Sequence, residues 1–286
     1  MSARGLDGRA RADEIGVAVG ARAAAFEATT GRRPLLADVL VGDDPAGAAY
    51  ARAKGRAAER RGVAYRLVHL PGGSDTAAVV GILTTLCADP AVDGILVAHP
   101  LPAACDEATV RAAIDPARDV DGVTPGSRAR LLDGRPGPRP ATALAVLDLL
   151  TAGDTALVGA RAVVIGRSPV VGMPAALLLV ASHATVTIAH SRTRDLAAVT
   201  RVADVIVAAA GVPGLLGPDH VRPGAVVIDV GTNVVAGPDG ERIVDFERVV
   251  EVAGVITPVP GGVGPVTTAI VLRTTLELAE ARADGR

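Results

Sequence analysis

Aromatic side chains are almost absent from this chain of 286 residues, which holds two Tyr, two Phe and no Trp. Proteins that bind single-stranded nucleic acid stack bases on aromatic rings, and a formal net charge of −2 provides no excess of basic groups for a polyanion. We therefore expect no nucleic-acid partner. Only two cysteines occur, Cys87 and Cys105, and their spacing fits neither a disulfide framework nor a metal site.

Long apolar runs are absent as well. No run reaches the roughly 18 residues that a membrane span requires, so we expect no membrane partner. Residues 1–12 are polar and rich in arginine, without the apolar segment of a signal peptide. Together with the scarcity of cysteine, this predicts a cytoplasmic protein.

Lysine is the scarcest basic residue, since Lys54 is the only lysine among 29 basic side chains. A codon-biased genome explains the abundance of arginine but not the one exception. Arginine keeps its proton in proteins, whereas lysine can lose it when its surroundings lower its pKa. Lys54 is therefore a candidate for a position that needs a removable proton.

Short apolar runs alternate with helical patterns in two series, which predicts an α/β fold with mainly parallel sheets. In the first series we expect strands at 35–41, 65–70 and 95–98, and helices at 46–62 and 76–87. In the second series we expect a helix at 142–150, strands at 162–165, 184–189, 205–209, 225–230 and 254–256, and a last helix at 267–283.

Residues 133–140 contain three prolines and two glycines and are the candidate linker between two domains. We expect a first domain formed by residues 1–140 and 265–286, because the last helix can pack back on it. The second, nucleotide-binding domain comprises residues 141–264.

Residues 161–174 have the pattern of a strand, a tight turn and the start of a helix. The turn contains Gly166, Arg167 and Ser168, and Gly172 follows it. Glycines allow close approach of a ligand to the backbone, and the amides at a helix N-terminus attract phosphate. The spacing is not the usual Gly-x-Gly-x-x-Gly, so an ordinary turn stays an alternative.

The end of the next strand suggests which dinucleotide binds. An NAD enzyme places a carboxylate there for the ribose hydroxyls, but this chain has His190, Ser191, Arg192 and Thr193. Guanidinium groups match phosphate geometry, so we predict NADP, with Ser191 and Arg192 as cofactor-binding residues. The alternative is that Arg192 and Arg194 are solvated loop charges.

Three further segments carry candidate site residues. Tyr50 and Lys54 lie four residues apart on one face of a predicted helix. Asp121 belongs to an acidic loop at 115–122 that could hold the donor groups of a heterocycle, or could be a solvated turn. Proline and glycine are dense at 257–265, and we expect Pro260, Gly261 and Gly262 to contact substrate.

Together these residues resemble the methylenetetrahydrofolate dehydrogenase/cyclohydrolase (FolD-type) family, from about residue 36 to 278. The motifs that carry the resemblance are VGDDPA (41–46), Tyr50-x-x-x-Lys54, DGILV (93–97), PLP (100–102), DVDG (119–122), VIGRS (164–168), VGMP (171–174), VIDVG (227–231) and TPVPGGVGP (257–265).

The resemblance implies a two-domain fold with folate in the cleft between the domains, and a homodimer. It implies oxidation of 5,10-methylenetetrahydrofolate with NADP and hydrolysis of the methenyl product to 10-formyltetrahydrofolate, in the one-carbon metabolism that serves purine biosynthesis. By position, Lys54 resembles the essential cyclohydrolase lysine, Tyr50 the residue packed on the folate, and Asp121 the anchor of the pterin edge. Gly166, Arg167, Ser168, Ser191 and Thr232 resemble cofactor contacts.

The chain departs from the family pattern at several positions. The glutamine that usually partners the lysine is Ala98, and a methyl group cannot form a hydrogen bond. His99 could replace it only if the strand has already ended, since neighbouring side chains on a strand point to opposite faces. Ala141, Ala143 and Gly47 replace other usual side chains.

Hydride transfer needs positioning more than acid–base catalysis, whereas hydrolysis needs proton transfer. We therefore expect the dehydrogenase to persist and the cyclohydrolase to be weak. Three alternatives are a dehydrogenase without hydrolysis, a non-catalytic paralogue that binds folate or NADP, and an enzyme of this fold that acts on another small substrate. A short-chain dehydrogenase, which also uses Tyr-x-x-x-Lys, is disfavoured because its nucleotide turn precedes that motif.

Overall fold

The computed structural model describes residues 3–231 and 244–285. Contacts divide the chain into two units. One unit contains residues 1–12 and 142–267, and the other contains residues 13–141 and 268–286. We call the first the nucleotide unit and the second the lysine unit, after Lys54. Their predicted α/β class is confirmed, and every strand pair in both sheets is parallel.

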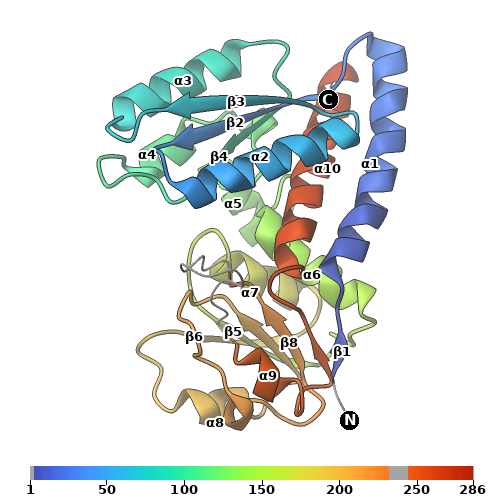
Figure 1. Cartoon of the computed structure of the whole chain (residues 1–286), viewed down its shortest axis with the longest axis vertical. Coiled ribbons are helices and arrows are strands. Elements are labelled where there is room, and N and C mark those ends of the chain that lie inside the picture. Colours follow the sequence, from blue (N-terminus) through green and yellow to red (C-terminus); the bar gives the residue numbers. More distant parts are fainter. Residues whose placement is uncertain (1–2, 232–243, 286) are drawn as a thin grey trace. The chain divides into compact units, whose positions relative to one another are not determined.

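The lysine unit is built on a three-stranded sheet with the order β3-β2-β4 (Figure 1). Its strands are β2 (Leu35–Val41), β3 (Ala64–Leu70) and β4 (Gly94–Val97). Its helices are α2 (Pro45–Arg60), α3 (Thr76–Ala88), α4 (Glu107–Ala112), the 3₁₀ turn η1 (Pro116–Arg118) and α5 (Pro125–Leu132). The strands predicted at 35–41, 65–70 and 95–98 are thereby confirmed to within one residue at each end.

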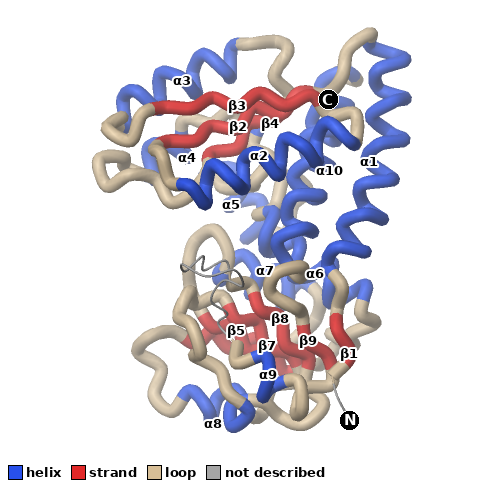
Figure 2. Tube along the Cα trace, in the orientation of Figure 1, coloured by secondary structure: helices blue, strands red, loops and turns tan. Residues whose placement is uncertain are grey.

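The nucleotide unit is built on a six-stranded sheet with the order β1-β9-β8-β7-β5-β6 (Figure 2). Its strands are β1 (Arg4–Gly5), β5 (Arg161–Ile165), β6 (Thr185–Ala189), β7 (Val205–Ala208), β8 (Val226–Asp229) and β9 (Val255–Ile256). Its helical elements are α6 (Ala141–Ala152), α7 (Gly172–Ala181), α8 (Leu196–Thr200), the 3₁₀ turn η2 (Pro218–His220) and α9 (Phe246–Val249).

The order of strands β5 to β9 places the first of them between the second and the third. In such doubly wound sheets a ligand binds beyond the carboxyl ends of the strands at which the order reverses. Here the order reverses between β5 and β7, and the turn with Gly166 follows β5 directly. The topology therefore puts the predicted nucleotide turn where this class of sheet binds its ligand.

Two long helices were predicted poorly. Helix α1 (Gly8–Thr30) was not expected, and α10 (Val263–Ala283) begins four residues before the expected residue 267. Proline is tolerated in the first helical turn because the missing N–H needs no partner there, so Pro265 does not delay α10. The boundary between the two units falls within each of these helices.

The N-terminal residues differ from the expected division of the chain. Residues 1–12 were expected in the first domain, but they group with the nucleotide unit. Strand β1 explains the difference, because it pairs with the outer edge of β9. The amide of Arg4 donates to the carbonyl of Gly254 at 2.9 Å, and the amide of Leu6 donates to the carbonyl of Ile256 at 2.9 Å.

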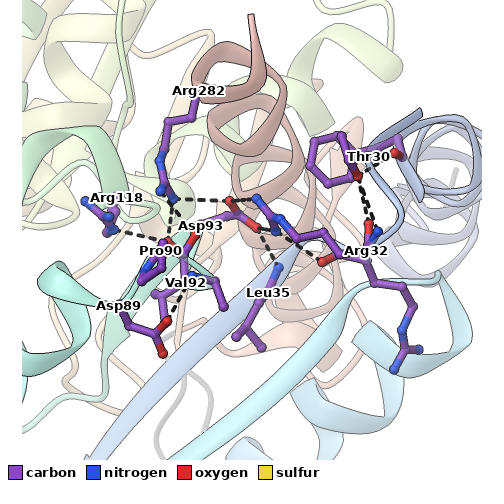
Figure 3. A network of polar contacts seen from close by, with 12 residues as sticks. Thr30, Arg32, Leu35, Asp89, Pro90, Val92, Asp93, Arg118 and Arg282 are labelled. Carbon is purple, nitrogen blue, oxygen red and sulfur yellow. Dashed lines mark hydrogen bonds and ion pairs between the residues drawn. The ribbon is translucent and has the colours of Figure 1, made fainter. Parts of the chain in front are cut away.

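A buried carboxylate, Asp93, organises one end of the lysine unit (Figure 3). Arg32 binds it with both guanidinium nitrogens, at 2.6 and 2.9 Å, and Arg282 of α10 lies 3.2 Å away. The amide of Leu35 also donates to it at 2.9 Å. The carbonyl of Val92 accepts bonds from Arg282 and from Arg118. One carboxylate thus joins the start of β2, the start of β4 and the last turn of α10.

We expect Asp93→Ala to lower the free energy of unfolding by about 1–3 kcal/mol, because it leaves the amide of Leu35 and the partly exposed guanidinium groups of Arg32 and Arg282 without their acceptor. Urea denaturation followed by circular dichroism measures this loss. The control is Asp133→Ala, whose partner Arg135 is exposed, and it should leave the urea midpoint unchanged. Equal midpoints for the two variants would contradict a central role for Asp93.

Candidate functional site

Helix α2 presents the only lysine of the chain to the sheet. Asp44 caps the helix by accepting a bond from the amide of Gly47 at 2.8 Å, and Pro45 begins its first turn. The face of α2 that packs against the sheet carries small residues and Lys54, whose side chain is only 2% exposed. The ammonium lies 5.0 Å from the centre of the Tyr50 ring, a cation–π contact. The two residues therefore share one face of α2, as predicted.

A carboxylate that the sequence analysis missed meets this ammonium. Nζ of Lys54 lies 2.7 Å from Oδ2 of Asp38 on β2, and Asp38 is fully buried. The hydroxyl of Tyr65 on β3 donates to the same oxygen at 2.5 Å and lies 3.0 Å from the carbonyl of Ala51. The sequence did contain a signal, because Asp38 interrupts an otherwise apolar buried strand and a buried charge needs a partner.

Tyr50 connects this cluster to α10. Its hydroxyl lies 3.2 Å from Oγ1 of Thr268, a residue that the sequence analysis did not single out. Tyr50 is 45% exposed, so part of its ring is open to a ligand. Desolvation of the phenol is nevertheless the main cause that raises the pKa of Tyr50, and the charges of Asp121 and Asp38 add to it, whereas the Thr268 bond lowers it.

Two carboxylates of the acidic loop differ in role: one holds the loop together, and the other can bind a ligand. Asp119 is fully buried and accepts bonds from the amides of Val123 and Thr124, so it fixes the loop. Asp121 is half-buried and accepts one long bond, 3.3 Å, from the amide of Ala141. Burial raises the pKa of Asp121 to about 7, and the charge of Asp119 adds to this, although the charge of Lys54 opposes it.

The lysine unit therefore brings Tyr50, Lys54 and Asp121 within electrostatic reach of one another. An ammonium, a flat ring and a carboxylate with a raised pKa can bind a heterocycle and transfer protons. Within residues 3–231 and 244–285 no cluster of His, Cys, Asp or Glu could hold a metal ion.

Two departures from the family pattern lie at the end of β4. The strand ends at Val97, and the amide of Ala98 extends the ladder by one bond to the carbonyl of Val39. His99 therefore follows the strand, and its Nδ1 lies 3.7 Å from Glu107. Burial lowers the pKa of His99, and the charge of Glu107 partly opposes this.

The turn after β5 is shaped by close backbone approach. Gly166 has a φ of +120°, and a Cβ there would lie 2.4 Å from the carbonyl oxygen of Ala209. A Cβ on Gly172 would lie 2.2 Å from the carbonyl oxygen of Gly166. The hydroxyl of Ser168 accepts bonds from the amides of Val171 and Gly172 at 3.1 and 3.3 Å. The glycines and the serine thus build a tight turn at the start of α7.

The predicted NADP-specificity residues lie in exposed loops. Arg167, Ser191 and Arg192 are exposed, and neither guanidinium has an ion-pair or hydrogen-bond partner in the described part of the chain. The backbone amide of Arg192 donates to Nδ1 of His190 at 3.1 Å, which fixes this loop. Thr232 lies outside the described residues.

The predicted substrate segment at 260–262 belongs to the nucleotide unit and leads directly into α10. The peptide bond between Val259 and Pro260 is cis, and Gly261 has a φ of +108°. The unusual path that the sequence predicted is therefore present. A contact of Pro260, Gly261 or Gly262 with substrate stays a prediction.

Comparisons with known proteins cover nearly the whole chain. Residues 6–121 match the catalytic-domain model, and residues 140–283 the NAD(P)-binding-domain model, of tetrahydrofolate dehydrogenase/cyclohydrolase. Among relatives, the bifunctional protein FolD 2 of Frankia alni is 50% identical over 285 residues, which cover 99% of this chain and 98% of the relative.

Solved structures agree with this result. FolD of Campylobacter jejuni has a TM-score of 0.93 and 38% identity, with 97% of this chain and 98% of that chain covered. FolD of Trypanosoma brucei, solved with NADP and an inhibitor, has a TM-score of 0.95 and 36% identity, with 99% of both chains covered.

The raised pKa of Asp121 predicts how stability depends on pH. The carboxyl of an unfolded Asp titrates near pH 4, so between about pH 4 and pH 7 the folded chain holds a proton here that the unfolded chain has lost. Stability from this group therefore falls as the pH rises through this window. We expect Asp121→Asn to melt at a higher temperature than the parent at pH 8, with a smaller difference at pH 5.5.

Thermal denaturation without folate measures this difference. Asp133→Asn, at an exposed position, should shift neither melting temperature. A melting temperature of Asp121→Asn that stays below the parent at pH 8 would contradict the raised pKa.

Proposed function

The chain belongs to the tetrahydrofolate dehydrogenase/cyclohydrolase family, and from this premise we propose that it oxidises 5,10-methylenetetrahydrofolate to 5,10-methenyltetrahydrofolate with NADP and hydrolyses the product to 10-formyltetrahydrofolate. The observation that carries the proposal is the buried amine of Lys54 beside Tyr50 and Asp121. Both family domains are present in one chain.

We assign the substrate to the lysine unit. The open part of the Tyr50 ring offers a surface on which a pterin can stack. Asp121 would accept hydrogen bonds from the amino-pyrimidinone edge, and donors on that edge would favour its ionised form. Pro260, Gly261 and Gly262 are further proposed substrate contacts.

We assign NADP to the nucleotide unit. The pyrophosphate would lie at the turn between Gly166 and Gly172, where glycines let a ligand approach the backbone closely at the start of α7. Arg167, Ser191 and Arg192 follow the neighbouring strands β5 and β6, and we assign their exposed side chains to the 2′-phosphate. Bound NADP supplies the acceptor for a hydride.

The oxidation requires little acid–base catalysis by the protein. The methylene carbon loses a hydride while the lone pair of a neighbouring substrate nitrogen forms the new C=N bond. Tyr50 and Asp121 contribute by holding the pterin in one orientation. The charge of Lys54 stays unchanged in this step.

The hydrolysis depends on proton transfer. Water forms a C–O bond with the methenyl carbon, the bond from that carbon to N5 breaks, and a carbonyl group forms. Both protons leave the water oxygen, one for N5 and one for solvent. Lys54 is the group that we assign to this transfer.

A homodimer, a cytoplasmic location and a supply of formyl groups to purine biosynthesis are further proposals, which rest on the family resemblance. The outer edge of β3 lacks a neighbouring strand in the lysine unit, among the described residues. This edge is a place where a second copy could pair. No helix in the described ranges is both long and apolar enough to cross a bilayer.

The proposed function is tested by following NADPH formation at 340 nm with methylenetetrahydrofolate, and methenyl hydrolysis at the absorbance of the methenyl compound. Catalysis of both reactions supports the proposal. NADPH formation without hydrolysis identifies a dehydrogenase-only enzyme. Binding of NADP and folate without turnover identifies the non-catalytic paralogue and overturns the proposal.

Replacing Ala98 tests why the hydrolysis is expected to be weak. We expect Ala98→Gln to raise the hydrolysis rate by about tenfold or more, because an amide adds a hydrogen-bonding group that the methyl lacks. Dehydrogenation should stay within about twofold. Ala98→Met has similar size without the amide and should leave both rates unchanged. The expectation fails if the glutamine variant hydrolyses no faster than the parent.

Removing one guanidinium tests the preference for NADP. We expect Arg192→Ala to raise the KM for NADP by about 10–100-fold, because one charged hydrogen-bonding partner is lost. The KM for NAD should change little. Arg194→Ala is the matched control in the same loop. Steady-state kinetics with both nucleotides measure the effect, and equal changes for NADP and NAD would refute the assignment.

A further inference from the structure

Three polar side chains in contact with one another cross the core of the lysine unit from α2 to β3. Lys54 of α2 contacts Asp38 of β2, and Asp38 accepts a bond from Tyr65 of β3. The other carboxylate oxygen of Asp38, Oδ1, is buried without a hydrogen-bond partner among the described residues. An unsatisfied buried oxygen costs free energy, so this arrangement is not optimised for stability alone.

A gain in folding stability does not explain why this buried ion pair is present. A buried ion pair gains little over apolar residues of similar volume, because desolvation offsets the attraction. β2 is otherwise apolar, with Val39 and Leu40 following Asp38. An apolar residue at position 38 would fit the strand, but it would leave Lys54 without a counter-charge. The carboxylate is thus explained by the amine that it contacts.

The neighbouring strand offers no alternative partner on this face of the sheet. Asp38 pairs in register with Leu96 of β4, so the side chain two residues later, at Ala98, lies on the same face. Ala98 has no polar group, and His99 contacts Glu107 instead. Asp38 is therefore the carboxylate that meets Lys54 in the described structure.

Helix α2 is also adapted to this arrangement. Gly55 follows Lys54, and a Cβ at Gly55 would lie 2.9 Å from Cδ1 of the Tyr65 ring. The absence of a side chain lets this ring pack on α2 while its hydroxyl reaches Asp38. The position of the carboxylate is thus fixed from two elements.

We propose that Asp38 is a positioning residue for the hydrolysis, which holds the Lys54 amine and its proton in place, and that Tyr65 fixes Asp38. The inference rests on the proposed function. With the ammonium held by Asp38, Lys54 gives a proton to N5 as the bond between N5 and the former methenyl carbon breaks, and takes one from the water oxygen that has bonded to that carbon. The pair ends the reaction in its starting state, and the second water proton goes to solvent.

The groups that surround the amine come from four segments. They are Asp38 on β2, Tyr65 on β3, Tyr50 on α2, and Asp121 in the loop after η1. Asp119 acts on Asp121 by its charge. Of these groups, Asp38 forms the ion pair with the ammonium, so its replacement should alter the charge balance at the amine most strongly.

The scarcity of lysine makes a direct measurement possible. Labelling with lysine enriched in ¹³C at Cε and ¹⁵N at Nζ gives one side-chain signal, because Lys54 is the only lysine. We expect its Cε and Nζ signals to shift in Asp38→Asn, because the carboxylate in contact with the ammonium is removed. Signals that stay at their parental positions overturn the proposal.

Kinetics supply the second measurement. Asp38→Asn should lower kcat for hydrolysis by about 10–100-fold, since a misplacement of about 1 Å can cost this much, and should change kcat for dehydrogenation less than about threefold. Tyr65→Phe keeps the ion pair and should lower hydrolysis several-fold, which tests the proposal even if Asp38→Asn fails to fold. Parental hydrolysis rates in both variants overturn it.

Asp93→Asn is the matched control, since Asp93 is equally buried and ion-paired but contacts none of the site residues described above. It should leave the lysine signal and the ratio of the two activities unchanged. A parent protein that lacks both activities overturns the proposed function, whereas the lysine signal in Asp38→Asn still decides whether Asp38 holds the amine.

Discussion

A charge inside a protein core must meet an opposite charge, and this constraint organises the lysine unit. The ammonium of Lys54 is almost fully buried and is balanced by Asp38, whereas the carboxylate of Asp93 is balanced by Arg32 and Arg282. The first pair joins α2 to β2, and the second joins α10 to the starts of β2 and β4. The first pair joins consecutive elements and the second joins segments that are distant in sequence, so the sheet and its helices depend on both.

Much of the fold could be predicted from the sequence, because its strands are short apolar runs between turn residues. Leu35–Val41 was predicted with its bounds, and the other strands of the two series to within about one residue at either end. Helix α1 was missed because alanine and glycine occur all around it and weaken the pattern of the buried residues Ile15, Val19, Ala23 and Phe26, although their spacing is helical. The two-residue strand β1 has no pattern of its own, since only its pairing with β9 defines it.

The candidate site could be predicted where it depends on local spacing. Tyr50 and Lys54 lie four residues apart on one helix, so their contact follows from helix geometry. Asp38, Tyr65 and Thr268 were missed, because their contacts depend on strand register and on the packing of α10, which no short motif encodes. The turn at Gly166 was predicted because close backbone approach requires glycine. The roles of Arg167, Ser191 and Arg192 stay predictions, because the function of an exposed side chain depends on the ligand that it binds.

The division of the chain has a consequence for its synthesis. Each unit combines segments from both ends of the sequence: β1 joins a sheet whose neighbouring strand β9 ends at Ile256, and Arg282 of α10 binds the segment before β4. A ribosome that has released the first 141 residues has therefore delivered neither unit in full. The nucleotide unit needs strand β9 and the lysine unit needs helix α10, so the apolar strands made earlier must avoid aggregation until those elements are available.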